Sequence, residues 1–149
     1  ETIEVAFTQA RNNGAMTVLN PAPARNIPAS LLALANIVVP NETESAAIGG
    51  TKNLLNLGVA TVVTTLGADG ASINTASSTT HIEPHKVTPI DTVGAGDAFI
   101  GATCAELSRG ASIEDAARMG AIAGALATTV KGAVPSLPTR EAVLAAQKS

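Results

Sequence analysis

Aromatic and basic side chains are scarce in this 149-residue chain, which has Phe7 and Phe99 but no tryptophan or tyrosine. Proteins that bind single-stranded nucleic acid without sequence preference usually stack bases on aromatic rings. Nine Lys and Arg residues against twelve Asp and Glu give a formal net charge of −3, and the basic residues form no cluster. These two shortages argue against nucleic acid and against an anionic membrane surface as partners. The expected ligand is therefore a small molecule.

Cysteine and long apolar runs are scarce as well. Cys104 is the single cysteine, which excludes a disulfide or a cysteine metal site within these residues and favours a reducing, cytoplasmic location. No apolar run approaches the roughly 18 residues that a membrane span needs. The opening Glu1-Thr2-Ile3-Glu4 lacks the basic region of a signal peptide. Because it enters a helical pattern without a starting Met, we expect the chain to be cut from a longer protein.

Hydrophobic residues make up 46% of the chain, enough for one sizeable core and for one domain or part of one. Apolar runs predict strands, and amphipathic segments that end at glycine predict helices between them. Ser30 is expected to cap a short helix through Ala35. This alternation indicates an α/β fold with a mostly parallel sheet and helices on both faces. The expected strands are 15–19, 37–39, 59–65 and 71–75, and the main expected helices are 1–13, 51–57, 96–108 and 113–129.

The stretch Asp91-Thr92-Val93-Gly94-Ala95-Gly96-Asp97-Ala98-Phe99 is a small-residue turn that opens into a helix. Gly94, Ala95 and Gly96 carry almost no side chain, so their N–H groups can approach a ligand closely. The start of a helix attracts phosphate, above all the charge of a phosphoryl group in transit. A carboxylate at Asp97 beside a phosphate is best explained as a general base that takes the proton of an attacking hydroxyl.

The same stretch is also compatible with a plain helix start, in which Asp91 or Thr92 is the cap and Asp97 complements the helix dipole.

Two other phosphate-binding motifs do not fit the sequence. A dinucleotide-binding G-x-G-x-x-G would need glycine in place of Phe99, and Gly49-Gly50-Thr51-Lys52 has the wrong order for a Walker sequence.

Two further loops follow expected strands. Asn41 and Glu44 come after strand 37–39, where their spacing also suits a capping box. The loop 66–70 follows strand 59–65 and could be a plain turn. Because open α/β sheets bind ligands at the carboxyl ends of their strands, we expect these loops to gather at one sheet edge.

Residues 91–99 match every fixed position of D-T-x-G-A-G-D-x-F, and the chain thereby resembles the ribokinase-like carbohydrate kinases of the PfkB family. Residues 20–24, 41–44, 65–70 and 131–136 are similar to further family elements in the expected order. The resemblance implies a three-layer αβα, Rossmann-like fold. It also implies that residues 1–149 are the C-terminal nucleotide-binding and catalytic part of a single domain, without its N-terminal part and lid.

The activity implied by this resemblance is ATP-dependent phosphorylation of a sugar hydroxyl, with D-ribose to D-ribose 5-phosphate as the first expectation. Asp97 would be the base and contact the sugar, and Gly94, Ala95 and Gly96 would form the anion hole. The alternatives are another sugar or nucleoside kinase of the family, acting on fructose or an adenosine-like nucleoside, and a nucleotide-binding fragment without catalysis. The isolated chain is expected to be inactive, and the full-length protein is expected to be a homodimer.

The resemblance also implies three cofactors, namely ATP, Mg²⁺ and K⁺. Glu44 would act on magnesium indirectly. The nucleotide-binding residues would be Asn41, Glu44, Thr65, Leu66, Gly67, Ala68, Asp69, Gly70 and Gly96. The monovalent cation would be bound at Asp91, Val93, Ala127, Val130, Gly132 and Ser136.

Overall fold

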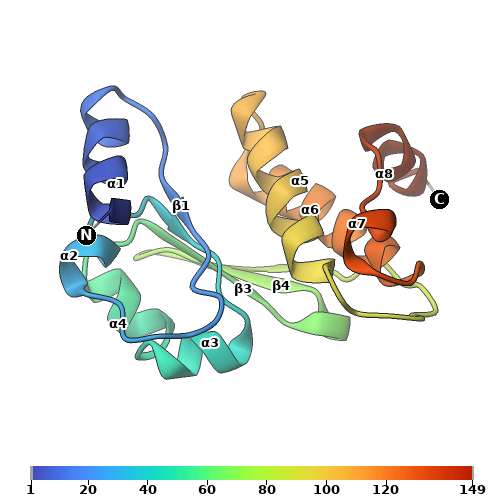
Figure 1. Cartoon of the computed structure of the whole chain (residues 1–149), viewed down its shortest axis with the longest axis horizontal. Coiled ribbons are helices and arrows are strands. Elements are labelled where there is room, and N and C mark those ends of the chain that lie inside the picture. Colours follow the sequence, from blue (N-terminus) through green and yellow to red (C-terminus); the bar gives the residue numbers. More distant parts are fainter. Residues whose placement is uncertain (1, 149) are drawn as a thin grey trace. The chain divides into compact units, whose positions relative to one another are not determined.

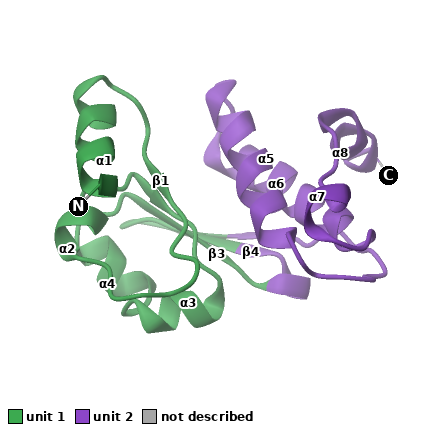
Figure 2. Cartoon of the chain, in the orientation of Figure 1, with its two compact units in different colours: residues 1–66, 72–80 green, residues 67–71, 81–149 purple. Residues whose placement is uncertain are grey.

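The computed structural model describes residues 2–148, which fall into two compact units (Figure 2). Unit 1 comprises the residues up to 66 together with 72–80. Unit 2 comprises 67–71 and the residues from 81 onward.

Five strands form one sheet in the order β1-β2-β3-β4-β5. β1, β2 and β3 pair in parallel, with Leu19 opposite Val38 and Val38 opposite Val62. β3 and β4 are joined by a short turn that contains the 3-10 helix η1, and neighbouring strands joined in this way run antiparallel. The sheet is therefore mixed, and the expected α/β fold is confirmed. The bounds are β1 Val18–Leu19, β2 Ile37–Val38, β3 Thr61–Thr65, η1 Gly67–Asp69, β4 Ala71–Asn74 and β5 Thr79–Ile82.

Helix α1 (Thr2–Asn12) ends in a Schellman motif, as the glycine at position 14 predicted. Gly14 has φ +74° and donates to Arg11 O at 3.0 Å, and Ala15 N donates to Ala10 O at 2.9 Å. The N–H of Ala15 belongs to this helix end, and the N–H of Thr17 donates to the Asn36 side chain at 2.9 Å. β1 therefore begins only at Val18 and is shorter than expected.

Three further helices belong to unit 1: α2 (Ala29–Leu32), α3 (Glu42–Ala47) and α4 (Gly50–Asn56). The prediction that Ser30 caps α2 is wrong. Pro28 is the N-cap residue with extended ψ 139°, so the helix has already begun when Ser30 is reached. The Ser30 hydroxyl instead donates to Glu4 of α1.

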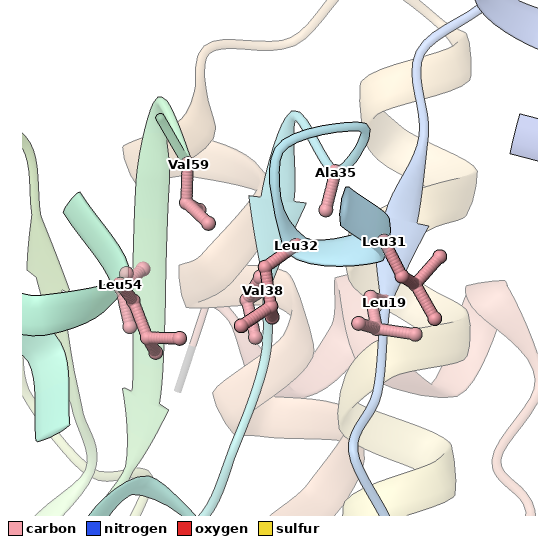
Figure 3. Packing of buried hydrophobic residues seen from close by; sticks show 8 residues of the cluster. Leu19, Leu31, Leu32, Ala35, Val38, Leu54 and Val59 are labelled. Carbon is pink, nitrogen blue, oxygen red and sulfur yellow. The ribbon is translucent and has the colours of Figure 1, made fainter. Parts of the chain in front are cut away.

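The core of unit 1 lies between β1–β3 and helices α2 and α4 (Figure 3). Leu19, Val38 and Val62 form a row across the three parallel strands, because paired positions point to the same face. Leu54 of α4 is completely buried against this cluster. Burial of such apolar side chains is the main force that holds a helix on a sheet. The buried members are Leu19, Leu31, Leu32, Ala35, Val38, Leu54, Val59 and Val62.

Unit 2 contains α5 (Ala95–Ser108), α6 (Ile113–Ala127), α7 (Ala133–Ser136) and α8 (Arg140–Ala146). α5 and α6 lie side by side (Figure 1). A Cβ atom at Gly120 would lie 2.8 Å from Phe99 O, and one at Gly124 would lie 3.1 Å from Ala95 O. These two glycines therefore let the backbones approach closely. No helix within residues 2–148 has the length and apolar character needed to cross a bilayer.

Candidate active site at the start of helix α5

The start of α5 offers backbone donors that are not used within the protein. Gly94 is the N-cap residue, has φ +83° and supplies no side-chain cap. Within residues 2–148, the N–H groups of Gly94, Gly96 and Asp97 donate no hydrogen bond. The N–H of Ala95, which was expected to be a third open donor beside the two glycines, closes the turn by donating to Thr92 O at 3.3 Å. The open donors therefore lie on either side of Ala95.

Two other helices of unit 2 show how such a donor is normally satisfied. The third helical N–H of α6, at Asp115, is accepted by the Ser112 hydroxyl at 3.1 Å. That of α8, at Ala142, is accepted by the Thr139 hydroxyl at 3.3 Å. Asp97 holds the same third position in α5, but Gly94 has no side chain that could accept from it. The missing cap leaves both a donor group and the positive end of the helix dipole available to an anion.

The Asp97 side chain is exposed in the first turn of α5. A carboxylate in this position can accept a proton from an approaching hydroxyl, provided that the hydroxyl comes within hydrogen-bond reach. The start of α5 thus combines open anion donors with a potential base.

Asp91 fixes the turn that leads into α5. Its Oδ1 atom accepts from Val93 N at 3.1 Å, and its Oδ2 atom accepts from Gly132 N at 2.9 Å. The hydrogen bond from Gly132, and then that from Val93, hold the pKa of the Asp91 carboxyl below its usual value. In addition, Thr128 O accepts from the backbone N–H groups of both Ile90 and Asp91, at 2.7 and 3.0 Å. Segments 90–93 and 128–132 are therefore tied together.

Thr128 was not singled out by sequence reasoning. It contributes a backbone carbonyl, which any residue type has, and its partners are far away along the chain. No local pattern could have revealed it.

The expected monovalent-cation residues lie on these two segments, at the last residue of α6 (Ala127) and on α7 (Ser136). Within residues 2–148, the carbonyl oxygens of Val93, Val130 and Gly132 accept no hydrogen bond, whereas Ala127 O accepts from Val130 N at 3.4 Å. Ser136 is buried, and its hydroxyl donates to Ala133 O at 2.8 Å. Open carbonyl oxygens, such as those of Val93, Val130 and Gly132, are the kind of ligand that K⁺ takes in proteins.

In unit 1, Asn41 and Glu44 form a complete capping box at the start of α3. Asn41 Oδ1 accepts from Glu44 N at 2.8 Å, and Glu44 Oε2 accepts from Asn41 N at 3.0 Å. Asn41 also forms a parallel bridge to Thr65 at the end of β3, next to a hydrogen bond from Thr65 N to Pro40 O at 3.0 Å. The structure thus brings Asn41 and Thr65 together at the carboxyl ends of adjacent strands. The carboxylate of Glu44 is a hard oxygen donor of the kind that suits Mg²⁺ or one of its waters.

The loop Leu66-Gly67-Ala68-Asp69-Gly70 is a tight turn around η1. Gly67 has φ +58° and Gly70 has φ +86°, a region that favours glycine. A Cβ atom at Gly70 would lie 2.9 Å from Pro84 N, so this position also requires a residue without a side chain.

Within the described part of the chain, no three His, Cys, Asp or Glu side chains form a metal-binding cluster.

Comparison with known proteins extends this picture. The model of the pfkB family carbohydrate kinases matches residues 1–140. Ribokinase of Staphylococcus aureus (strain COL) is 40% identical over 151 residues, which cover 93% of this chain and 50% of the relative. The structure of Arabidopsis thaliana ribokinase complexed with ribose and ATP has a TM-score of 0.91 at 29% identity, covering 99% of this chain and 52% of that one.

A structure from E. coli in complex with ATP and Mg²⁺ has a TM-score of 0.85 at 26% identity, covering 99% of this chain and 53% of that one. The chain thus spans about half the length of these relatives. The family match extends over nearly all of the chain and includes the turn at the start of α5. The chain belongs to the pfkB family of carbohydrate kinases.

Proposed function

We propose that the complete protein containing this chain is an ATP-dependent sugar kinase that converts D-ribose to D-ribose 5-phosphate. The observation that carries the proposal is the start of α5, where the open N–H groups of Gly94 and Gly96 stand next to the exposed carboxylate of Asp97. Ribose is preferred as substrate because relatives at 40% and 29% identity are ribokinases, one of them complexed with ribose and ATP.

In the proposed reaction, the sugar hydroxyl attacks the γ-phosphorus of ATP. Asp97 accepts the hydroxyl proton, a new oxygen–phosphorus bond forms, and the bond to the β-phosphate oxygen breaks to release ADP. The donors at Gly94 and Gly96 stabilise the charge on the phosphoryl oxygens during transfer. Because Asp91 ties the preceding turn to Gly132, these donors are held in place before the substrate arrives.

The nucleotide is proposed to bind through the loop 65–70, with Asn41 and Glu44 near its phosphates. Magnesium would neutralise phosphate charge, and Glu44 would act on the ion or its water. A monovalent cation would be bound by the open carbonyl oxygens of Val93, Val130 and Gly132, next to the clamp formed by Asp91. A cytoplasmic location and a homodimer of the complete protein remain predictions.

The test is an Asp97→Asn variant of the complete protein, compared with Asp115→Asn. The control is closely matched, since both aspartates are exposed and occupy the third position of a helix in unit 2. Loss of a general base should lower kcat for ribose by roughly 10²- to 10⁴-fold, while the affinity for MgATP persists. Asp115→Asn should leave kcat within a factor of about two, since an exposed ion pair such as that of Asp115 with Arg118 contributes little.

Unchanged turnover in Asp97→Asn would remove this residue from the mechanism. Phosphorylation of fructose or of a nucleoside in preference to ribose would retain the mechanism and change the substrate. MgATP binding by the wild-type protein without phosphorylation of any of these acceptors would contradict the kinase proposal.

A further inference from the structure

Asn20, at the end of β1, makes contacts that the proposed reaction does not yet use. Its Nδ2 atom donates to Val39 O at 3.2 Å, and its Oδ1 atom accepts from Ala22 N at 3.0 Å. The side chain is exposed, yet both ends of its carboxamide bind the backbone. The bond to Val39 O is part-buried and the bond from Ala22 N is exposed, and such hydrogen bonds add only modest net stability because water competes for both partners. The main effect of these contacts is therefore on the position of the backbone that they hold.

The ladder between β1 and β2 explains why a side chain is needed here. Ile37 N donates to Thr17 O at 3.1 Å, and Val39 N donates to Leu19 O at 2.8 Å. In a parallel ladder with this register, the next donor on β1 would be the N–H of residue 21, directed to Val39 O. Residue 21 is proline and has no N–H. The Asn20 amide thus supplies the hydrogen bond that the backbone cannot make.

The carbonyl that Asn20 holds lies just before the capping box of α3. Val39 O accepts from Asn20 on one side, and the next carbonyl, Pro40 O, accepts from Thr65 N at 3.0 Å on the other. Two successive carbonyls are therefore held from opposite sides, one by Asn20 after β1 and the other by Thr65 of β3. The residue that follows is Asn41, whose backbone and side chain make the reciprocal hydrogen bonds with Glu44.

We infer that Asn20 is a positioning residue for MgATP, because it replaces the missing N–H of Pro21 and fixes the backbone that presents Asn41 and Glu44. The inference rests on the proposed function, in which those two residues lie near the nucleotide phosphates. In the proposed complex, Asn20 itself touches neither the nucleotide nor the sugar. Its loss should weaken MgATP binding without removing a ligand contact.

The chain provides a matched control at the opposite ends of the same two strands. Asn36 Oδ1 accepts from Thr17 N at 2.9 Å and from the Thr17 hydroxyl at 2.9 Å, so Asn36 also joins β1 to β2. It lies at the amino end of β2, whereas Asn20 acts at the carboxyl end. If Asn20 only joined the two strands, as Asn36 does, neither substitution would change the Kd for MgATP.

The experiment is calorimetric titration of the complete protein with MgATP, together with urea unfolding, for wild type, Asn20→Ala and Asn36→Ala. Asn20→Ala should raise the Kd for MgATP roughly three- to tenfold, as expected for one hydrogen bond, with little change in the unfolding midpoint. Asn36→Ala should lower the midpoint and leave the Kd unchanged. In the double variant Asn20→Ala/Pro21→Ala, the restored backbone N–H should recover part of the lost affinity.

An unchanged Kd in Asn20→Ala overturns the inference, as does an equal increase in Asn36→Ala. If the wild type phosphorylates no sugar, the proposed function fails, whereas a Kd difference between the two variants still supports positioning by Asn20. If the wild type does not bind MgATP, both fail.

Discussion

Substitution of Gly94 by alanine tests whether the turn before α5 is held against the segment that begins at Gly132. Gly94 has φ +83°, and a Cβ atom there would lie 3.1 Å from Ala133 Cα and 3.3 Å from Ala133 Cβ. Gly110, just beyond the other end of α5, has φ +87° and nothing within 4 Å of the corresponding position. Alanine at either site would be strained by the positive φ. Only alanine at position 94 would also come too close to Ala133.

The expected free energies follow from this difference. A non-glycine residue in the left-handed region costs roughly 1–2 kcal/mol, and the reduced freedom of the unfolded chain returns about 0.4–1 kcal/mol. Gly110→Ala should therefore destabilise the protein by no more than about 1.6 kcal/mol. Gly94→Ala adds a contact that Ala133 must relieve by moving, and overpacking of this kind costs roughly 1–3 kcal/mol more.

The assay is urea unfolding followed by far-UV circular dichroism, with both variants made in the same background. We expect a clearly lower unfolding free energy for Gly94→Ala than for Gly110→Ala, together with weaker MgATP binding only in the former. Equal destabilisation would refute the reasoning, because it would show that Ala133 does not restrain the turn.

Two further predictions concern the core of unit 1 and the hydrogen bonds that Asp91 accepts from Val93 and Gly132. Leu54→Ala should lower the unfolding free energy by roughly 2–5 kcal/mol in the same urea assay, since Leu54 is 0% exposed within the core of unit 1; a loss below 1 kcal/mol would show that the site collapses freely. Asp91 has a folded-state pKa below its ordinary value of 3.8, so its stabilisation is present above that value and disappears as the pH falls through the lower folded-state pKa. Asp91→Asn should therefore have a lower unfolding free energy than wild type at pH 7, and this difference should shrink on acidification below about pH 4. A difference that does not depend on pH would exclude the carboxylate as its cause.

Local signals predicted several helix ends correctly, although Ser30 does not cap α2. Gly14 closes α1, Ser112 caps α6, and Asn41 with Glu44 forms the expected capping box. In each case the hydrogen-bond partners lie within a few residues of one another, so the spacing of residue types is sufficient. The small residues at 94–96 likewise indicated a helix start, in which the N–H groups of Gly94 and Gly96 are open and that of Ala95 is not.

The contacts that hold the candidate site were decided by tertiary structure alone. Asp91 and Gly132 are 41 residues apart, and nothing in either local pattern specifies that they meet. The same holds for Asn20 and Val39, where the sequence shows an asparagine before a proline but not the neighbouring strand that needs its amide. Sequence alone thus determined which groups remain unpaired within their own turn or helix. Which distant group satisfies them depends on how the strands and loops pack, because a hydrogen bond forms wherever folding brings a donor and an acceptor within reach.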